Sequence, residues 1–320
     1  MDLLVVGSMG YDHIQTPTTH GYDVLGGSAV HASISAAFHL PLKPGILPRV
    51  GIIGPIGNDF RGEDLELLNE KGINTEGVAK LSGKTFRWAG KYEGTMNDAQ
   101  TISTEINVLG DFDPVIPNFW KDVDILFCAN MNPLTQVKIL EECNPNISVL
   151  DTFMLWINTE LEVLSEALRK VDVAILNEEE VCAISGEDIV TIAAEKIISG
   201  EALYGGSSAG KGPRSLIIKR GSGGVLAYLP CGTISLPSYP TKKVIDPTGC
   251  GDSFAGALLA NIVGCTGAMG DIEIMRNALV HATVTSSFVI GGLGSTNLTD
   301  LQKGKYHARV DKYRRIVGLT

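Results

Sequence analysis

The sequence predicts one α/β domain, with a mostly parallel sheet between two layers of helices and a second, small sheet that projects from it. Three observations lead to this prediction. Short apolar runs alternate with segments of helical periodicity along most of the chain. One segment shows instead the two-residue alternation that is typical of half-exposed strands. The 320 residues, 44% of them apolar, suffice for one large domain, so we expect residues 1–320 to fold as a single unit.

The expected core strands are continuous apolar runs, the pattern of strands that are buried on both faces. They lie at residues 3–6, 50–53, 125–127, 148–150, 173–176 and 216–218. The helices expected between them lie at residues 28–40, 61–71, 158–170 and 191–200. Such an alternation predicts parallel strands joined by crossover helices, and ligands then bind beyond the carboxyl ends of the strands.

Residues 80–108 break the alternation of strands and helices. Polar and apolar side chains alternate there, first around Phe86 to Trp88, then at Lys91 and Tyr92, and again over residues 101–106. This pattern predicts half-exposed antiparallel strands, and hence a small sheet beside the core.

Composition excludes several classes of function. A formal net charge of −10 and a pI near 5.1 argue against a nucleic-acid or anionic-membrane partner. The apolar run at residues 3–6 is too short for a signal peptide, and no run approaches the length of a membrane span. The six cysteines show no paired spacing, as expected for reduced thiols in a cytoplasmic protein.

The most informative stretch begins at Asp246 and reads DPTGCGDSFAGALL. The β-branched run at residues 243–245 predicts a strand, the glycines predict a turn, and the apolar spacing after them predicts a helix. We expect the turn to leave the amides of Gly249, Cys250 and Gly251 unpaired at the helix N-terminus, where they would attract an anion. Asp252 would be a weak base there, which suffices for orienting a hydroxyl in phosphoryl transfer. The alternative is an ordinary glycine turn with a capping Asp.

This stretch resembles the C-terminal signature of the ribokinase family, also called the PfkB carbohydrate kinases. The resemblance implies a three-layer α/β/α core and a cofactor requirement for ATP and Mg²⁺, with the γ-phosphate of ATP moving to a hydroxyl of a sugar, nucleoside or related molecule. It makes Asp252 the catalytic base and Gly249, Cys250 and Gly251 the anion hole, although Cys250 stands where the family more often has Ala. The small sheet, with residues 12–25, resembles the family's lid over the substrate, and we expect a homodimer to form through it.

The N-terminal part resembles the acceptor-binding signature of the same family. Asp12 could accept hydrogen bonds from vicinal hydroxyls, while Gly26 and Gly27 allow backbone to approach the acceptor. His31 departs from the family, which commonly has an Asn there, and a histidine that simply packs in its helix is the alternative. Asn130 and Asp151 follow core strands and are further candidates for lining the pocket.

The nucleotide and metal elements also occur in family order. Asn177 and Glu180 resemble the N-x-x-E element, in which Asn177 would bind ATP and Glu180 would organise Mg²⁺ through water. The family resemblance also assigns Lys219, Gly221, Gly224 and His281 to ATP binding. It makes six residues candidate neighbours of a K⁺ ion: Asp246, Thr248, Ser287, Ile290, Gly292 and Thr296.

The acceptor itself is left open by the sequence. Phe86, Trp88, Tyr92 and Trp156 are aromatic side chains that could stack on a sugar or on a nucleobase, whereas Arg87 could clamp a phosphate on the acceptor. We predict an ATP-dependent kinase of a sugar or sugar-like hydroxyl, with a nucleoside kinase as the alternative. A phosphosugar kinase and a non-catalytic binding protein are less favoured, and a dinucleotide-dependent oxidoreductase is disfavoured because no GxGxxG follows the first strand.

Overall fold

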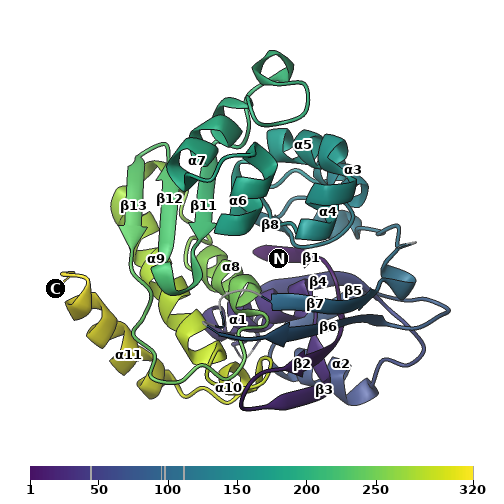
Figure 1. Cartoon of the computed structure of the whole chain (residues 1–320). Coiled ribbons are helices and arrows are strands. Elements are labelled where there is room, and N and C mark those ends of the chain that lie inside the picture. The colour runs from purple at the N-terminus through teal and green to yellow at the C-terminus, as the bar shows by residue number, and fades with distance from the viewer. Residues whose placement is uncertain (44, 95, 97–98, 111, 320) are drawn as a thin grey trace.

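The structure is a computed structural model that describes residues 1–43, 45–94, 96, 99–110 and 112–319. Within these residues the strands form a nine-stranded sheet and a four-stranded sheet. The large sheet contains β1 (Leu3–Val6), β4 (Val50–Ile56), β5 (Ile73–Lys80), β8 (Ile125–Cys128), β9 (Ile147–Leu150), β10 (Val173–Asn177), β11 (Ser215–Lys219), β12 (Val225–Leu229) and β13 (Gly232–Leu236). Their order is β13-β12-β11-β10-β9-β8-β1-β4-β5, so that β1 is the third strand from the β5 edge (Figure 1).

The large sheet is parallel from β5 to β11, and the hairpin of β12 and β13 adds two antiparallel strands at one edge. All six core strands predicted from apolar runs are present, within a few residues at their ends. β5, β12 and β13 were not predicted, because they are half-exposed and lack a continuous apolar run; β5 and β13 are the edge strands. The parallel order brings the carboxyl ends of β8, β9, β10 and β11 to one edge of the sheet.

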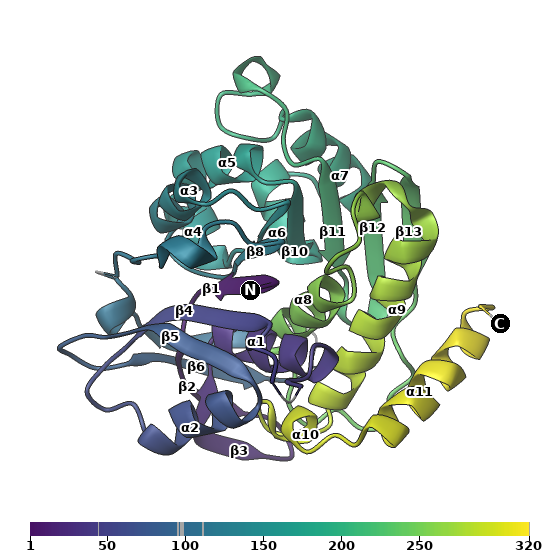
Figure 2. The same ribbon diagram turned by 180° about the vertical axis from the view of Figure 1, so that it is seen from behind.

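Helices cover both faces of the large sheet (Figures 1 and 2). Successive strand residues point to opposite sides, so that Leu3 and Val5 pack in one core while Leu4 and Val6 pack in another. The first core includes α1 (Ser28–His39), α8 (Cys250–Ala260) and α9 (Ile272–Val289). The opposite face is covered by α3 (Pro133–Glu142), α5 (Leu161–Lys170), α6 (Glu178–Ser185) and α7 (Val190–Ser199). The predicted three-layer fold is therefore confirmed.

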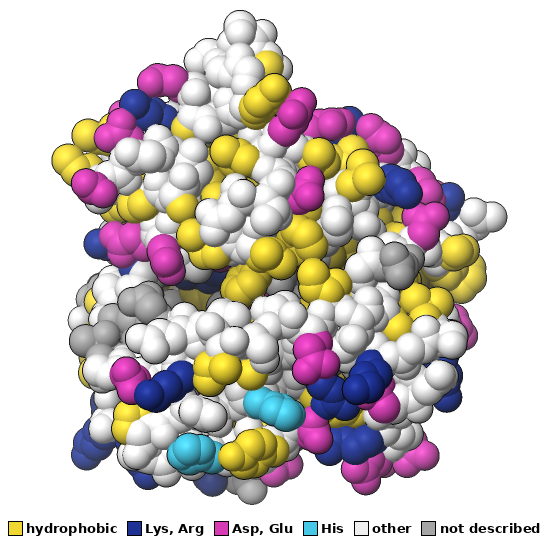
Figure 3. Space-filling view, turned by 45° about the vertical axis from the view of Figure 1, so that its right-hand side comes forward, with side chains coloured by type: hydrophobic (Ala, Val, Ile, Leu, Met, Phe, Trp, Pro, Cys, Tyr) yellow, Lys and Arg dark blue, Asp and Glu magenta, His cyan; other side chains and the backbone are white. Residues whose placement is uncertain are grey.

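The predicted small sheet is also present, in the order β3-β2-β6-β7. It consists of β2 (Gly10–Gln15), β3 (His20–Gly26), β6 (Phe86–Tyr92) and β7 (Ala99–Glu105), and we call these four strands the lid. Three of the residues predicted for it, 95, 97 and 98, lie outside the described residues. β2 and β6 pair in parallel and the outer pairs are antiparallel, which corrects the expectation of an all-antiparallel sheet. In Figure 3 the surface is hollowed between the lid and the part of the molecule above it.

Two local predictions are wrong. Residues 243–245 form no strand, because the amides of Ile245 and Asp246 both donate to Ile290 O at the end of α9 rather than to a neighbouring strand. The helix predicted at residues 158–170 is two helices, α4 (Met154–Thr159) and α5, which are separated at Glu160 by its non-helical backbone. The remaining helices are α2 (Gly62–Glu70), α10 (Thr296–Thr299) and α11 (Lys303–Ile316).

The C-terminal helix α11 packs along α9 at the outer edge of the molecule (Figures 1 and 2). It buries Tyr306, Val310 and Tyr313, and its Arg309 turns inward to donate to Ser287 O. None of the helices within the described residues combines the length and apolar character needed to cross a membrane.

Candidate active site

The turn before α8 leaves three neighbouring amides unpaired. Cys250 N donates to Pro247 O at 3.1 Å, which closes a β-turn whose third residue, Gly249, has a φ of 71°. Within the described chain no acceptor contacts the amides of Gly249, Gly251 and Asp252. The predicted anion hole is thus corrected at one position: the Cys250 amide is used inside the turn, and the Asp252 amide replaces it. Three N–H groups at the positive end of a helix form a site for an anion.

The Cys250 side chain lies against Ser286 in a setting that disfavours its reactive thiolate form. Its Sγ lies 3.9 Å from Ser286 O, and burial, followed by the charges of Asp246 and Asp252, raises the pKa of the thiol well above its usual value. A thiol that stays protonated is unreactive, so the residue acts as a small side chain in the turn.

Asp252 lies in the first turn of α8, between two groups of charged side chains. Its charge acts on Asp12 and His31 on one side and on Asp151, Glu180 and Lys219 on the other. Among the described residues no side chain or backbone group forms a hydrogen bond or ion pair with the Asp252 carboxylate. A half-buried carboxylate without a protein partner is available to accept a proton or a hydrogen bond from a ligand.

Asp12 and His31 form a buried pair on the first of these sides. His31 Nε2 lies 3.7 Å from Asp12 Oδ2, and His31 Nδ1 is 2.8 Å from Ser295 Oγ. Burial raises the pKa of Asp12, whereas for His31 the neighbouring Asp12 carboxylate outweighs burial and raises its pKa as well. A Cβ on Gly26 would lie 2.0 Å from Asp12 Oδ2, so only glycine leaves room for this carboxylate. The predicted approach of this backbone to an acceptor molecule stays a prediction.

Two further predicted residues lie beside this pair. Gly27 precedes α1, and Asn130 O accepts a hydrogen bond from Ser28 Oγ at the start of that helix, at 3.2 Å. Trp156 Nε1 donates to Asn130 Oδ1 at 2.9 Å, which fixes the amide and leaves its Nδ2 free to donate. The residues predicted for acceptor binding are thus brought together around the N-terminus of α1.

One aromatic residue of β6, Tyr92, contacts the turn before α8. Phe86, Trp88 and Tyr92 lie on one face of the strand, and Arg87 lies on the other. Thr248 Oγ1 donates to Tyr92 OH at 3.2 Å. Arg87 points to the opposite side, where it is bonded to the carboxylates of Asp23 and Asp59. The sequence-based role of Arg87 as a phosphate clamp is therefore wrong, because its charge is already paired away from the acceptor.

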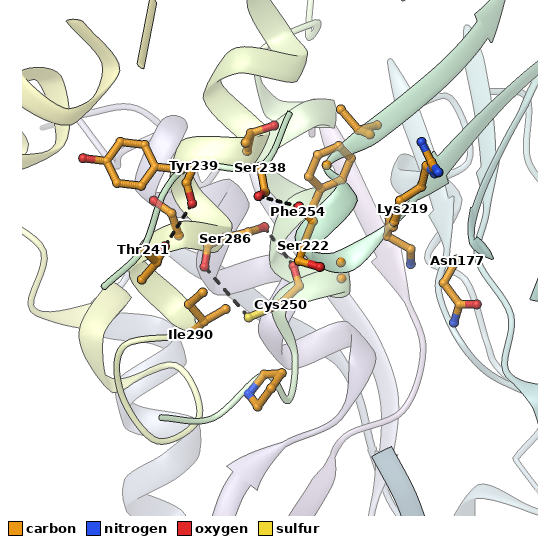
Figure 4. Close-up of a pocket in the computed structure, with 18 of the residues that line it drawn as sticks. Asn177, Lys219, Ser222, Ser238, Tyr239, Thr241, Cys250, Phe254, Ser286 and Ile290 are labelled. Carbon is orange, nitrogen blue, oxygen red and sulfur yellow. Dashed lines mark hydrogen bonds between the residues drawn. The ribbon is translucent and has the colours of Figure 1, made fainter. Parts of the chain in front are cut away.

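A cavity of about 910 Å³ lies on the other side of Asp252. Figure 4 shows Asn177 and Lys219 on one side of it, with Tyr239, Thr241 and Ile290 on the other. Asn177 and Lys219 are paired across β10 and β11, so both come from the carboxyl edge of the sheet. Four predicted ATP-binding residues line the cavity: Asn177, Lys219, Gly221 and Gly224.

His281 is a wrong prediction for ATP binding. Its ring stacks on Tyr306 of α11, and its Nδ1 lies 2.6 Å from the Tyr306 hydroxyl, on the face of α9 away from the cavity. Sequence reasoning missed the opposite wall, which is formed by Ser238, Tyr239, Phe254, Thr283 and Ser286. No local signal in the sequence marks Tyr239.

Glu180 is buried behind the cavity. Its Oε2 accepts a hydrogen bond from Asn177 N at 2.8 Å, and Asn177 Oδ1 accepts one from Glu180 N at 2.7 Å, which closes a capping box at the start of α6. Burial, followed by the charge of Asp151, raises the pKa of Glu180 to about 8. Among the described residues no three His, Cys, Asp or Glu side chains are arranged to bind a metal ion together. The role of Glu180 in holding a hydrated Mg²⁺ through water stays a prediction.

The K⁺ prediction fits the structure poorly at Ser287. Ser287 O accepts a hydrogen bond from Arg309 Nη1 at 2.8 Å, so a K⁺ ion on that oxygen would meet a guanidinium. Asp246 is buried, and its two carboxylate oxygens accept from Thr248 N at 2.8 Å and Gly294 N at 2.9 Å. For the other five candidates the K⁺ site stays a prediction: Asp246, Thr248, Ile290, Gly292 and Thr296.

Comparison with known proteins shows that this chain is similar to kinases. The family model described as pfkB family carbohydrate kinase matches residues 26–300. A cytidine kinase of Thermococcus kodakarensis is 28% identical over 267 residues, which cover 81% of this chain and 88% of that protein. The crystal structure of a Methanocaldococcus jannaschii nucleoside kinase superposes with a TM-score of 0.72 at 20% identity, over 98% of this chain and 99% of that chain. A putative ribokinase II from E. coli, in complex with ATP and Mg²⁺, has a TM-score of 0.72 at 19% identity, over 97% and 99%.

Proposed function

Because the chain belongs to the pfkB family of carbohydrate kinases, we propose that it transfers the γ-phosphate of ATP to a hydroxyl of a nucleoside. One observation carries the transfer chemistry: the free amides of Gly249, Gly251 and Asp252 adjoin an unpaired Asp252 carboxylate, between a buried Asp–His pair and a cavity large enough for a nucleotide. The similarity to a cytidine kinase supports a nucleoside as the acceptor.

Different residues would serve different parts of the transfer reaction. Asp252 orients the acceptor hydroxyl and receives its proton late in the step, since the transition state is loose and needs little basicity. The three amides donate hydrogen bonds to the phosphoryl oxygens where negative charge is present during transfer. Asn177, Lys219, Gly221 and Gly224 line the nucleotide side. Mg²⁺, when bound, supplies neutralisation of phosphate charge, and Glu180 would hold it through water.

The acceptor site suits a ribose with a base attached. The Asp12 carboxylate can accept from two vicinal hydroxyls, while His31 Nε2 is buried and has no hydrogen-bond partner among the described residues. Trp88 shares the acceptor-facing side of β6 with Tyr92, and its ring offers a face for stacking. A free sugar would use the Asp12 end alone, so a nucleoside fills more of this site.

The lid also supports the expected homodimer. β7 is a free edge strand of the lid, and Ile102 on it is 55% exposed. An exposed edge with apolar side chains is a surface on which a second copy can pair. We propose that the chain dimerises there, and sedimentation velocity of the purified protein tests the proposal.

A panel of acceptors tests the proposed function. We expect ADP release from ATP and Mg²⁺ with one or more nucleosides, at a kcat/KM at least tenfold above that with free ribose or any hexose, because the base adds binding contacts that a free sugar lacks. ADP release should be measured with a coupled assay, and the phosphorylated product should be identified by mass spectrometry. If only a free sugar supports turnover, the acceptor is a sugar and not a nucleoside. If no acceptor supports turnover, the kinase proposal is contradicted.

A further inference from the structure

Lys219 places an ammonium group against the first turn of α8. Its Nζ lies 2.7 Å from Asp151 Oδ2, and the two side chains are only 17% and 4% exposed. A Cβ added to Gly251 would lie 3.1 Å from the same Nζ, so the ammonium touches the helix backbone where the amides are unpaired. The pair joins β9 to β11 across 68 residues of sequence.

The N-terminal end of a helix repels a cation placed beside it, so the Lys219 ammonium needs negative charge nearby. A helix N-terminus carries partial positive charge, and a cation beside it is repelled. Nearby carboxylates offset that repulsion, above all Asp151, which is bonded to the ammonium. Burial alone would lower the pKa of Lys219, but these carboxylates outweigh it and raise the pKa, so the side chain is charged. The ammonium thus lies beside the turn whose three amides are unpaired, where both would stabilise a phosphoryl group.

Asp151 is fixed by its surroundings. Its Oδ1 accepts from Thr152 N at 2.9 Å, and its backbone oxygen accepts from Gln136 Nε2 at 2.9 Å. The carboxylate is buried and cannot swing away to follow a moving partner. It therefore defines where the long and flexible Lys219 side chain ends.

We propose that Lys219 is a catalytic residue, which contacts the phosphoryl group while it moves from ATP to the acceptor, and that Asp151 is the positioning residue that holds the ammonium there. The proposal rests on the proposed function. In this step the bond from the γ-phosphorus to the ADP oxygen breaks, the bond from phosphorus to the acceptor oxygen forms, and the acceptor proton passes to Asp252. Lys219 keeps its protons and forms no covalent bond.

A catalytic role for Lys219 and a role in ATP binding alone predict different changes in kcat and KM. A contact made equally in the ground state and the transition state changes KM, whereas a contact that strengthens during transfer changes kcat. Lys219→Met keeps the length of the side chain and removes its charge. We expect kcat to fall by about 100-fold, as for the loss of one preorganised donor, while the KM for ATP changes by less than about threefold.

Three variants separate this role from a structural one. Asp151→Asn should lower kcat by about tenfold, because the ammonium keeps its charge but loses its fixed position. The double variant Asp151→Asn, Lys219→Met should be no slower than Lys219→Met alone, since Asp151 acts through Lys219. The double variant also removes the uncompensated buried carboxylate that could unfold Lys219→Met. Lys211→Met, on an exposed loop, is the matched control and should behave as wild type.

Gly251→Ala provides a test that leaves every charge in place. The added Cβ must displace the ammonium by a few tenths of an ångström, while alanine is favoured in a helix by about 1 kcal/mol. We expect an unchanged or higher melting temperature together with a lower kcat. Kinetics, melting temperature and ADP affinity should be measured for all variants.

The outcomes distinguish this proposal from the proposed function. If Lys219→Met or the double variant keeps kcat within twofold of wild type, or if the loss appears only in the KM for ATP, Lys219 is not catalytic. An additive loss in the double variant would overturn the role of Asp151. If wild type has no turnover, or if Asp252→Asn stays active, it is the proposed function that fails.

Discussion

Asp252→Asn lowers kcat by about 10³-fold or more and leaves nucleotide affinity within about twofold of wild type. The amide has the shape of the carboxylate but cannot receive a proton, and its N–H₂ group would point a donor at the acceptor hydroxyl. The amides of the turn and the walls of the cavity do not change. Turnover with ATP and the best acceptor of the panel gives kcat, and calorimetry with ADP gives the affinity.

The matched control for this change is Asp271→Asn. Asp271 also lies at a helix N-terminus, where it caps α9 by accepting from Glu273 N and Ile274 N, and asparagine caps equally well. This variant should retain wild-type kcat and melting temperature. If Asp252→Asn keeps more than about a tenth of the wild-type kcat, Asp252 has no part in proton transfer.

Gly249→Ala should be both less stable and nearly inactive. The backbone at Gly249 has a φ of 71°, which costs a non-glycine residue about 1–2 kcal/mol. The added Cβ would also lie 2.4 Å from the ring of His31, so the turn must move away from the Asp12–His31 pair. Because that movement shifts adjacent amides together, we expect kcat to fall by about 10³-fold, the upper part of the range for an oxyanion-hole donor.

A second glycine separates backbone strain from displacement of the amides. Gly267 has a φ of 75°, and a Cβ there would meet no atom within 4 Å. Gly267→Ala should therefore lose stability to a similar backbone cost but keep its kcat. Thermal melts and saturation kinetics on both variants check this. Equal kcat values for the two variants would show that the turn does not position the transferred group.

The sequence predicted those features that depend on local pattern. Strands buried on both faces must be apolar throughout, so β1, β8 and β10 were located from their composition alone. The glycines before Asp252 likewise predicted a turn into a helix, and α8 begins at Cys250. The fold class and the turn that precedes α8 follow from these patterns.

Features that depend on distant partners could not be predicted. A β-branched run has the same sequence pattern whether its amides donate to a neighbouring strand or, as at Ile245, to the end of a helix 45 residues away in sequence. Arg87 carries the same charge whether it faces a ligand or Asp59, and His281 gives no sign that its partner is Tyr306. The Lys219–Asp151 pair is of the same kind, because only the order of parallel strands brings the two residues to one edge.

A crystal structure with ADP, Mg²⁺, the acceptor and aluminium fluoride tests the central claim most directly, because the planar fluoride mimics the phosphoryl group in transfer. We expect the fluorines to accept hydrogen bonds from the amides of Gly249, Gly251 and Asp252, with the Asp252 carboxylate within hydrogen-bonding distance of the acceptor hydroxyl. A fluoride group bound elsewhere, with those amides unpaired or turned toward protein acceptors, would contradict the account.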